Sequence, residues 1–565
     1  MKRRGPWGAR LVIFVMLLVV AACDRAEPAT GPGPAPADTR PVATPTATEA
    51  PENPVVLRLA MRELETSDPG LKLTLDPGVA MYPEALTLVD LLFEPLVRMD
   101  AAGRPQPAAA EKWEVAAGGA EYRFTLRPDL KWSDGSALTA ADFAYAWKRV
   151  LDPNVRSDAA YLLFPVEGAM SYADGLSANA DGVAIVAESE RVLKVTLTGP
   201  MMSFPARVAL WTFAPVNQEV LATVGERWTE PGNLVGNGPY MLAEWEHGTG
   251  MRLVRNPHYR DPSRQRTDEV TVTLVGTDSS PADRFAAGQA DIVELRGEDL
   301  NRARDDDELR RRSAVYDLAG NWFLVFNTTR APWDDVRVRR AFSLALDRER
   351  LVGLVFEGAE RPSASLLPKP ARSVAEPAAT TPQAGIDEAR RLLAEAGFLN
   401  GAGFPTVRFT YHQTARWDRL AEYLQARWSE VLGVQVEIDV REWRDFLDFT
   451  VEPGDFDIYR AGWNAEYRDP ENWHNVLWQS DDDFLRSGWV DAAYDDLVAA
   501  ANGERDPEAR AAAYARADAW LDEQLPGIPL ATRARGFLVG EGVMGIRVAA
   551  VGGYLVLDEV RLPDR

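Results

Sequence analysis

The chain has 565 residues, of which 62 are Lys or Arg and 85 are Asp or Glu, so its formal net charge is −23. This acidity argues against a nucleic-acid-binding protein, because such proteins neutralise phosphates with Lys and Arg. One cysteine cannot form an internal disulfide, and the four histidines include no pair at metal-ligand spacing. The motifs of hydrolases, phosphate-binding loops and dinucleotide sites are also missing, which disfavours an enzyme and predicts no cofactor.

The first 22 residues have the features of a secretory signal peptide. Four basic residues precede an apolar run over 11–22, which is shorter than the roughly 20 residues of a membrane span. The run ends in Val-Ala-Ala-Cys at 20–23, which resembles the lipobox of bacterial lipoproteins. We therefore expect lipid on Cys23 to hold the exported protein at a membrane, on the periplasmic face or the outer cell surface. An ordinary signal peptide with an incidental cysteine is the alternative.

Residues 23–53 are rich in Pro, Ala and Thr and have few large apolar side chains. Such a segment cannot bury enough apolar surface to offset the entropy of ordering it, so we expect a disordered tether. A Pro-rich chain is extended, at about 3.1 Å per residue. The tether would let the folded part reach a partner while it stays attached to the membrane.

The rest of the chain, from residue 54 to 565, is too long for one hydrophobic core, so two large lobes or three domains are expected. Strand-like and helix-like segments alternate, which predicts an α/β protein. The strand-like runs are 55–60, 121–126, 192–198, 270–275 and 434–440.

Residues 417–440 show this alternation clearly. Apolar residues at spacings of three and four predict one buried helix face, formed by Trp417, Leu420, Leu424, Trp428 and Val431. Gly433 is then expected as the C-cap, and the strand begins at Val434. Helical runs are also expected over 336–352 and over 387–396, the second ending at Gly397.

Short motifs follow one another along most of the chain. They read Leu-Phe-Glu-Pro-Leu-Val (92–97), Ala-Glu-Lys-Trp-Glu (110–114), Tyr-Arg-Phe-Thr-Leu-Arg (122–127), Lys-Trp-Ser-Asp-Gly (131–135), Thr-Ala-Ala-Asp-Phe (139–143), Asn-Gly-Pro-Tyr (237–240), Arg-Asn-Pro-His-Tyr (255–259) and Arg-Ala-Gly-Trp-Asn-Ala-Glu-Tyr-Arg-Asp-Pro (460–470). In this order they resemble the family 5 extracellular solute-binding proteins of ABC importers. The resemblance is greatest to the oligopeptide-binding branch.

The resemblance implies the type II (cluster C) periplasmic-binding-protein fold, with two lobes, an extra domain and a ligand cleft between the lobes. Lobe I would comprise 54–94, 214–322 and 534–565, the extra domain packed on it 95–213, and lobe II 323–533. Hinges are expected near Asn327 and Thr532, and ligand binding would close the lobes. The protein would then be a monomer that delivers an oligopeptide to ABC permease subunits.

Several motifs have local structural explanations. Residues 132–135 predict a turn, and Thr139 with Asp142 three residues later predicts a capping-box variant that opens a helix. Arg337, Arg339 and Arg340 are expected on a solvated helix face.

Residues 460–470 are the candidate ligand site. In the family this segment pairs with the main chain of the peptide, and Gly462 would permit that close approach. A carboxylate after it receives the α-ammonium group of the peptide. The matching residue is Glu466, where the family usually has Asp; its arm is about 1.5 Å longer. A surface glutamate is the alternative reading, and Asp469 is the second carboxylate considered.

Other candidates depend on the same resemblance. Trp463 and Trp443 match residues that form the walls of side-chain pockets, although both are equally plausible core residues, and Asn464 lies between the candidates Trp463 and Glu466. Arg460 matches a residue that can bind the terminal carboxylate of a short peptide. The basic residues that accompany it in some relatives are replaced here by Val451 and Trp417, so the carboxylate site is expected to be weaker or absent.

Tyr161 is a further candidate for the ligand site, on the basis of the sequence Ala-Ala-Tyr-Leu at 159–162. Two other functions remain open at this point. The same fold could bind a metal chelate, haem or an oligosaccharide, and a hydrolase is the more remote alternative.

Overall fold

The computed structural model describes residues 53–62, 73–276, 279–373, 382–451, 456–481 and 484–563. The predicted signal peptide, Cys23 and nearly all of the predicted tether lie outside these residues. Within the described ranges no helix is both long enough and apolar enough to cross a membrane.

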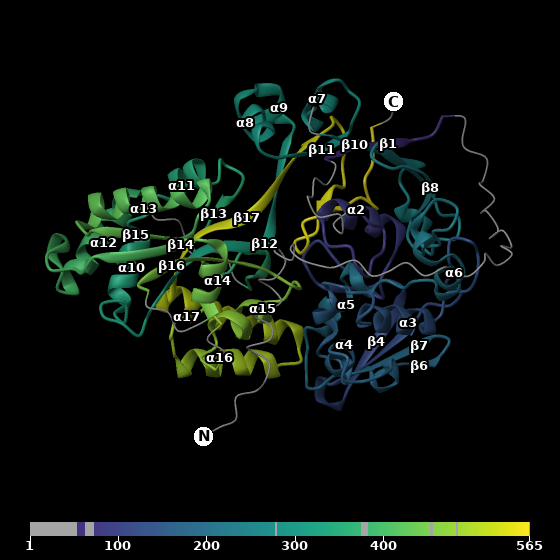
Figure 1. Ribbon diagram of the computed structural model, residues 1–565, viewed down its shortest axis with the longest axis horizontal. Helices are drawn as coiled ribbons and strands as arrows, with labels where there is room; N and C mark the ends of the chain where they lie inside the picture. Colours follow the sequence, from purple (N-terminus) through teal and green to yellow (C-terminus); the bar gives the residue numbers. More distant parts are fainter. Residues whose placement is uncertain are drawn as a thin grey trace, which may run out of the picture. The chain divides into compact units, whose positions relative to one another are not determined.

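The described chain forms two compact units, and the chain passes from one to the other twice. Unit 1 comprises residues 295–536, and unit 2 comprises residues 53–294 and 537–563. Both contain mixed sheets and helices (Figure 1), which confirms the predicted α/β class. The predicted lobe boundaries, the separate extra domain over 95–213 and the hinges near Asn327 and Thr532 stay predictions.

Unit 2 has two main sheets. The first has the order β11-β1-β10-β9-β8. Strand β1 is parallel to its neighbours β11 and β10, whereas the pairs β10–β9 and β9–β8 are antiparallel. Its strands are β1 (Val56–Arg62), β8 (Tyr240–Glu246), β9 (Gly250–Arg255), β10 (Glu269–Val275) and β11 (Ile292–Leu295). The second sheet is antiparallel, in the order β4-β5-β7-β6. It comprises β4 (Ala110–Ala116), β5 (Glu121–Leu126), β6 (Ile185–Ser189) and β7 (Val192–Thr196).

One helix of unit 2 begins where the sequence predicts a cap. Helix α3 (Ala140–Val150) opens at Thr139, whose backbone N–H donates to Asp142 Oδ2 at 2.8 Å, as the capping-box variant requires. The turn over 132–135 is also confirmed, because Gly135 has φ +88° and its N–H donates to the carbonyl of Trp132 at 2.9 Å. The other elements are α2 (Pro83–Leu92), α4 (Ala169–Ala173), α5 (Phe204–Val208), α6 (Gln218–Val224), α7 (Pro281–Ala286), β2 (Val97–Met99), β3 (Pro105–Pro107), β18 (Arg547–Val548) and β19 (Leu555–Val556).

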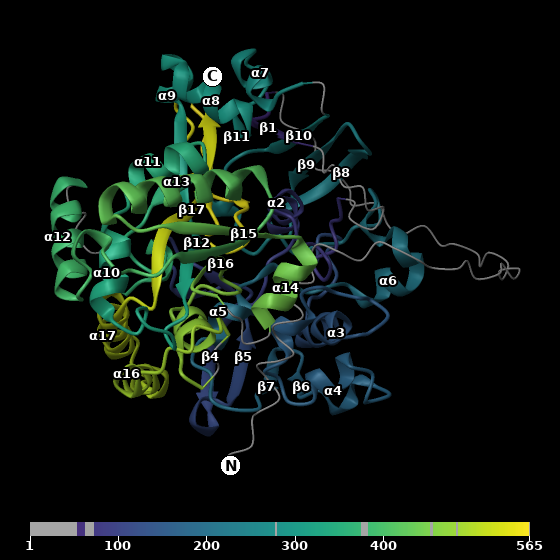
Figure 2. The same ribbon diagram turned by 60° about the vertical axis from the view of Figure 1, so that its left-hand side comes forward.

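Unit 1 is built on one sheet with the strand order β15-β14-β16-β12-β17. Its strands are β12 (Ser313–Phe326), β14 (Val407–His412), β15 (Val436–Arg441), β16 (Ile458–Asn464) and β17 (Gly527–Val539), and β13 (Arg361–Pro362) pairs with β17. Helices α10 to α13 pack their apolar residues against this sheet in one core, and Figure 2 shows α13 lying along its strands.

The helices of unit 1 are α8 (Glu298–Asp305), α9 (Asp307–Arg311), α10 (Val336–Leu344), α11 (Arg348–Val355), α12 (Pro382–Glu395), α13 (Ala415–Leu432), α14 (Trp443–Val451), α15 (Glu471–Trp473), α16 (Ala492–Gly503) and α17 (Pro507–Gln524). Helix α13 buries all five residues of the predicted apolar face and ends at Gly433, which has φ +72°. The prediction for this helix is therefore confirmed, C-cap included.

One expectation about α10 is wrong. Arg339 is only 4% exposed instead of solvated. Its guanidinium donates to the carbonyls of Trp333 at 2.8 Å and Gln524 at 2.6 Å, so it binds helix α10 to the end of α17. Burial lowers the pKa of Arg339 to about 10, which still leaves it protonated at neutral pH.

Candidate functional site

Strand β16 holds half of the predicted ligand residues and has one edge that is only partly paired. Strand β12 pairs antiparallel with its whole length, from Asn464 opposite Gly320 to Ile458 opposite Phe326. On the other side β14 pairs only with Ile458 and Tyr459. In the described part of the chain, residues 460–464 therefore have a strand partner on one side only.

The register shows which backbone groups face the unpaired side. The N–H of Ala465 donates to Ala319 O at 2.7 Å, and the N–H of Asn327 donates to Asp457 O at 3.0 Å. Because hydrogen-bonded and non-bonded pairs alternate in antiparallel strands, the odd-numbered residues of β16 bond to β12. The N–H and C=O groups of residues 462 and 464, and the C=O group of residue 460, are directed to the unpaired side. We call this the open edge of β16; such an edge can accept an added strand.

Gly462 lies at the centre of the open edge. It pairs with Trp322 of β12, and a Cβ atom placed on Gly462 would lie 2.4 Å from Cε3 of that indole ring. The ring thus occupies the space that a side chain at 462 would need. The requirement for glycine comes from within the chain, and the expected approach of a ligand at this position stays a prediction.

Arg460 is surrounded by rings, which include the predicted Trp417. The residue is 8% exposed, and its guanidinium carbon lies 4.7 Å from the ring centroid of Trp417 and 5.3 Å from that of Phe446. Its Nη2 atom lies 2.6 Å from His412 Nδ1. Trp443 is half-buried beside them, with its ring centroid 4.6 Å from that of His412.

The charge of Arg460 is not neutralised by a carboxylate within the described residues. Burial lowers its pKa to about 10, so it remains a cation at neutral pH. Burial and the neighbouring Arg460 lower the pKa of His412 to about 4. The imidazole is therefore neutral, so its Nδ1 accepts the hydrogen bond from Arg460. This arrangement leaves a desolvated positive charge next to the open edge.

Glu466 and Trp463 are tied to one atom at the end of β16. Asn472 Oδ1 accepts the indole N–H of Trp463 at 2.8 Å and the backbone N–H of Glu466 at 3.3 Å. Trp463 is buried, and Glu466 is 8% exposed. The reading of Glu466 as a surface side chain is therefore wrong; its role as the ammonium-binding carboxylate is untested.

The loop after Glu466 is held by ion pairs and hydrogen bonds. Both carboxylate oxygens of Asp469 are taken by Arg510, at 2.7 and 2.8 Å, which makes Asp469 a poor second candidate. His474 is fully buried, with Nδ1 2.7 Å from Tyr494 Oη and Nε2 3.0 Å from Asp518 Oδ1. No local signal in the sequence marks these partners, since each is supplied by a distant segment.

The remaining predicted residues lie elsewhere. Asn464 is exposed and accepts a hydrogen bond from Arg533 of β17. Tyr161 belongs to unit 2, in a short 3₁₀ turn over Ala160–Leu163. The structure thus gathers Arg460, Trp417, Trp443 and the residues of 462–466 in unit 1, whereas Tyr161 is in the other unit and Cys23 is outside the described residues. The described ranges contain no group of three or more His, Cys, Asp or Glu residues that could hold a metal ion.

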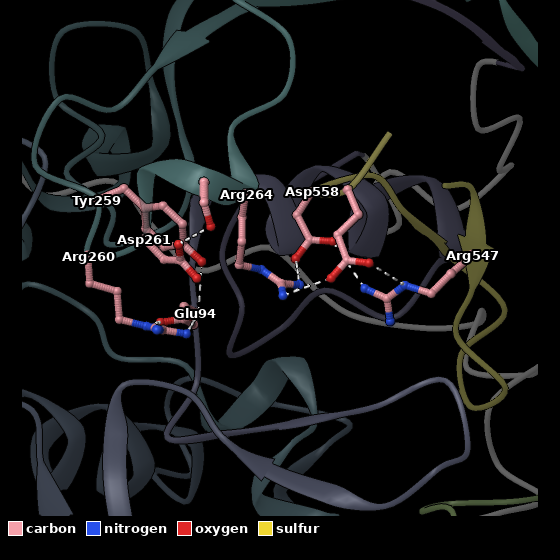
Figure 3. Close-up of polar contacts among 9 residues, drawn as sticks. Glu94, Tyr259, Arg260, Asp261, Arg264, Arg547 and Asp558 are labelled. Atoms are coloured by element: carbon pink, nitrogen blue, oxygen red, sulfur yellow. Dashed lines mark hydrogen bonds and ion pairs between the residues drawn. The ribbon is translucent and has the colours of Figure 1, made fainter. Parts of the chain in front are cut away.

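Unit 2 has a separate set of buried charges, which we call the Glu94–Asp558 network. Glu94 accepts hydrogen bonds from Tyr259 Oη at 2.9 Å and from Arg260 NH2 at 2.7 Å (Figure 3). Arg264 and Arg547 both pair with Asp558 (Figure 3). The network borders a charged pocket of about 450 Å³. Its lining comprises Asp261, Ser263, Arg264, Arg266, Met544, Gly545, Glu559 and Arg561, none of which was predicted as a ligand residue.

Comparison with known proteins gives consistent similarities. The family described as bacterial extracellular solute-binding proteins, family 5 (middle part), matches residues 104–484. The periplasmic oligopeptide-binding protein OppA of Salmonella typhimurium is 31% identical over 86% of this chain and 90% of its own length. The "Probable deoxycholate-binding periplasmic protein YgiS" of Escherichia coli is 32% identical, over 86% and 90%.

Solved structures show the same likeness. The unliganded open form of the periplasmic murein tripeptide-binding protein MppA has a TM-score of 0.80 and 27% identity, over 90% of this chain and 98% of its own. Haemophilus influenzae OppA in complex with the peptide RPPGFSPFR has a TM-score of 0.57 and 25% identity, with the same coverage. These similarities confirm the predicted type II periplasmic-binding-protein fold.

Proposed function

Because the chain belongs to the family 5 bacterial extracellular solute-binding proteins, close to the oligopeptide-binding branch, we propose that it is the substrate-binding lipoprotein of an ABC importer. It captures oligopeptides and delivers them to the membrane permease. The names of the reported relatives describe periplasmic binding proteins, which supports a role other than catalysis.

The open edge of β16 is the observation that supports a peptide ligand. The backbone groups of residues 462 and 464 and the C=O group of residue 460 face a side where the described chain supplies no strand partner. A peptide main chain has the matching donors and acceptors at the same spacing and can bind as an added strand. Recognition through the main chain provides affinity without selecting most side chains of the peptide, as an importer of varied peptides requires.

The charged groups at the two ends of this edge complete the proposal. Glu466 follows the strand and would receive the α-ammonium of the peptide. Arg460, at the other end, has no carboxylate partner among the described residues and would attract the terminal carboxylate. Closure of two lobes on the ligand, as expected from the family, is part of the same proposal.

Attachment to the membrane would come from the N-terminal lipid. The proposed lipid site is Cys23, and the tether over 23–53 would connect it to the folded units. The protein would act as a monomer with no cofactor and no nucleic-acid partner. Its lipid would hold it at the periplasmic face of a membrane or at the outer cell surface.

A carboxylated apolar ligand is the second candidate. The rings of Trp417, Phe446 and Trp443 near Arg460 would suit such a molecule, and one relative is described as deoxycholate-binding. Mass spectrometry of the ligand released from natively purified protein distinguishes the two candidates directly.

Titration calorimetry with peptides tests the assignment of Glu466. Glu466→Ala should weaken peptide binding more than about ten-fold, since the ammonium loses its charge partner. N-acetylation of the peptide should weaken binding to the unmodified protein but change little for Glu466→Ala. Equal losses on both proteins would contradict the ammonium role, whereas peptides that bind neither protein would contradict the proposed function itself.

A further inference from the structure

Two arginines near the open edge of β16 have aromatic partners but, among the described residues, no carboxylate partner. The guanidinium carbon of Arg533 lies 5.1 Å from the ring centroid of Trp322, and that of Arg416 lies 5.6 Å from the ring centroid of Phe356. The two rings are stacked, with their centroids 6.3 Å apart and an interplanar angle of 18°. We call these four residues, together with Glu360, the Trp322 cluster.

The single carboxylate of the Trp322 cluster is engaged by neutral donors. Glu360 Oε1 accepts the indole N–H of Trp322 at 3.1 Å, and Oε2 accepts the backbone N–H of Ala534 at 2.7 Å. No described carboxylate lies within ion-pair distance of Arg533 or Arg416. Burial also raises the pKa of Glu360. Even when ionised, Glu360 balances only one of the two arginines, so the Trp322 cluster carries a positive charge in a protein whose net charge is −23.

The Trp322 cluster adjoins the open edge through two contacts. Arg533 donates to the side-chain oxygen of Asn464, a residue whose backbone groups belong to the open edge. Trp322 covers Gly462, the residue at the centre of the edge. Burial and the nearby Arg416 and Arg535 lower the pKa of Arg533, while Glu360 opposes this. A half-buried guanidinium in such a place gains from an anionic partner.

We infer that the Trp322 cluster is a subsite for an acidic side chain of the bound peptide, with Arg533 as its direct partner, so that the protein prefers cargo containing Asp or Glu. This inference rests on the proposed function, because the peptide must lie along the open edge. Arg533 forms the charge-assisted hydrogen bond. Arg416, which is exposed, adds longer-range attraction, which salt weakens.

Calorimetry with matched peptides tests the preference. The probes are tri- to pentaalanine peptides in which one residue, moved through each position, is either Glu or Gln. At one position Glu should bind the unmodified protein about ten-fold more tightly than Gln. Arg533→Gln should reduce that preference to less than about three-fold, whereas Arg533→Lys should keep a substantial part of it. Arg391→Gln, at an exposed arginine of α12 paired with Glu388, is the matched control and should keep all of it.

The outcomes separate the two proposals. Peptides that bind with equal affinity for Glu and Gln at every position overturn the acidic subsite and leave the proposed function standing. A preference for Glu that survives in Arg533→Gln also overturns it. If Arg533→Gln does not fold, Arg416→Gln decides the matter: the preference must then fall about two- to three-fold. Failure of every peptide to bind the unmodified protein contradicts the proposed function, and the acidic subsite with it.

Discussion

Buried arginines are accommodated in two different ways in this protein. In the Glu94–Asp558 network of unit 2, Arg260 pairs with Glu94, and Arg264 pairs with Asp558. Along the open edge of β16 in unit 1, Arg460 lies against rings and a neutral imidazole instead. A carboxylate neutralises a guanidinium and stabilises the fold. Aromatic rings also hold a guanidinium in place, but they do not neutralise its positive charge. That charge could still pair with an anionic ligand.

The first prediction concerns a carboxylate of unit 2 and has the largest expected effect. Glu94→Gln leaves Arg260 buried without its counter-ion, which should lower the free energy of unfolding by about 3–5 kcal/mol. Urea unfolding measures this loss. Glu219→Gln, at an exposed carboxylate of α6, is the control and should cost little. A loss for Glu94→Gln no larger than for the control would show that the network is not a stabilising one.

Gly462→Ala has the next largest expected effect, because the ring of Trp322 fills the space beside Gly462. Gly462→Ala puts a methyl group where Cε3 of Trp322 is only 2.4 Å away, so the ring must shift. We expect a loss of about 1–3 kcal/mol in the free energy of unfolding, together with weaker peptide binding. Gly353→Ala, at a glycine of α11 with open space around it, is the control. Unchanged stability would mean that the ring is not held in this position.

Lowering the pH should destabilise the folded protein through His412, the histidine partner of Arg460. The pKa of His412 is lowered to about 4 in the folded protein, against about 6.5 in the unfolded chain. The folded state thus binds fewer protons, so this contribution to stability is complete above pH 6.5 and is lost as the pH falls towards 4. Over that range the unmodified protein should lose about 2 kcal/mol more than His412→Gln, as measured by unfolding at each pH. Parallel pH profiles would contradict the neutral state of the half-buried His412.

Removal of Arg460 should have the smallest effect on stability. Arg460→Met deletes a cation that no described carboxylate pairs with, and its apolar side chain fits among the rings, so the free energy of unfolding should change by less than about 1 kcal/mol. Binding of peptides with a free carboxyl end should weaken, while their C-terminal amides should bind as before. A loss of stability as large as that of Glu94→Gln would remove the contrast between the two regions.

The parts of the fold that follow local rules could be predicted from the sequence. The apolar spacing of Trp417, Leu420 and Leu424 gave helix α13, and Gly433 gave its end. The capping box at Thr139 depends only on a residue three positions away. Arg339 was placed wrongly, because the carbonyls that bind it, at the end of α17, are far along the chain.

The ligand role of residues 460–470 stays a prediction, and the contacts of these residues could not be predicted from the sequence. The resemblance pointed to residues 460–470, and the structure shows the open edge there. The partner of Arg460 is His412, 48 residues away, and the partner of Asp469 is Arg510, 41 residues away. Neither pair has a local signature. The spacing of residues in the sequence does not show which arginines will pack against aromatic rings and which will pair with carboxylates.

The open edge of β16 has a consequence for how this protein can change over evolutionary time. Its hydrogen-bonding groups belong to the main chain, so no substitution deletes them except proline, which removes the N–H and keeps the C=O. Mutations nearby alter the surroundings, such as the charges of Arg533 and Arg460, without removing the basic ability to hold an extended chain. If the open edge binds peptides as we propose, single substitutions can change which peptides are preferred while the main-chain groups are kept.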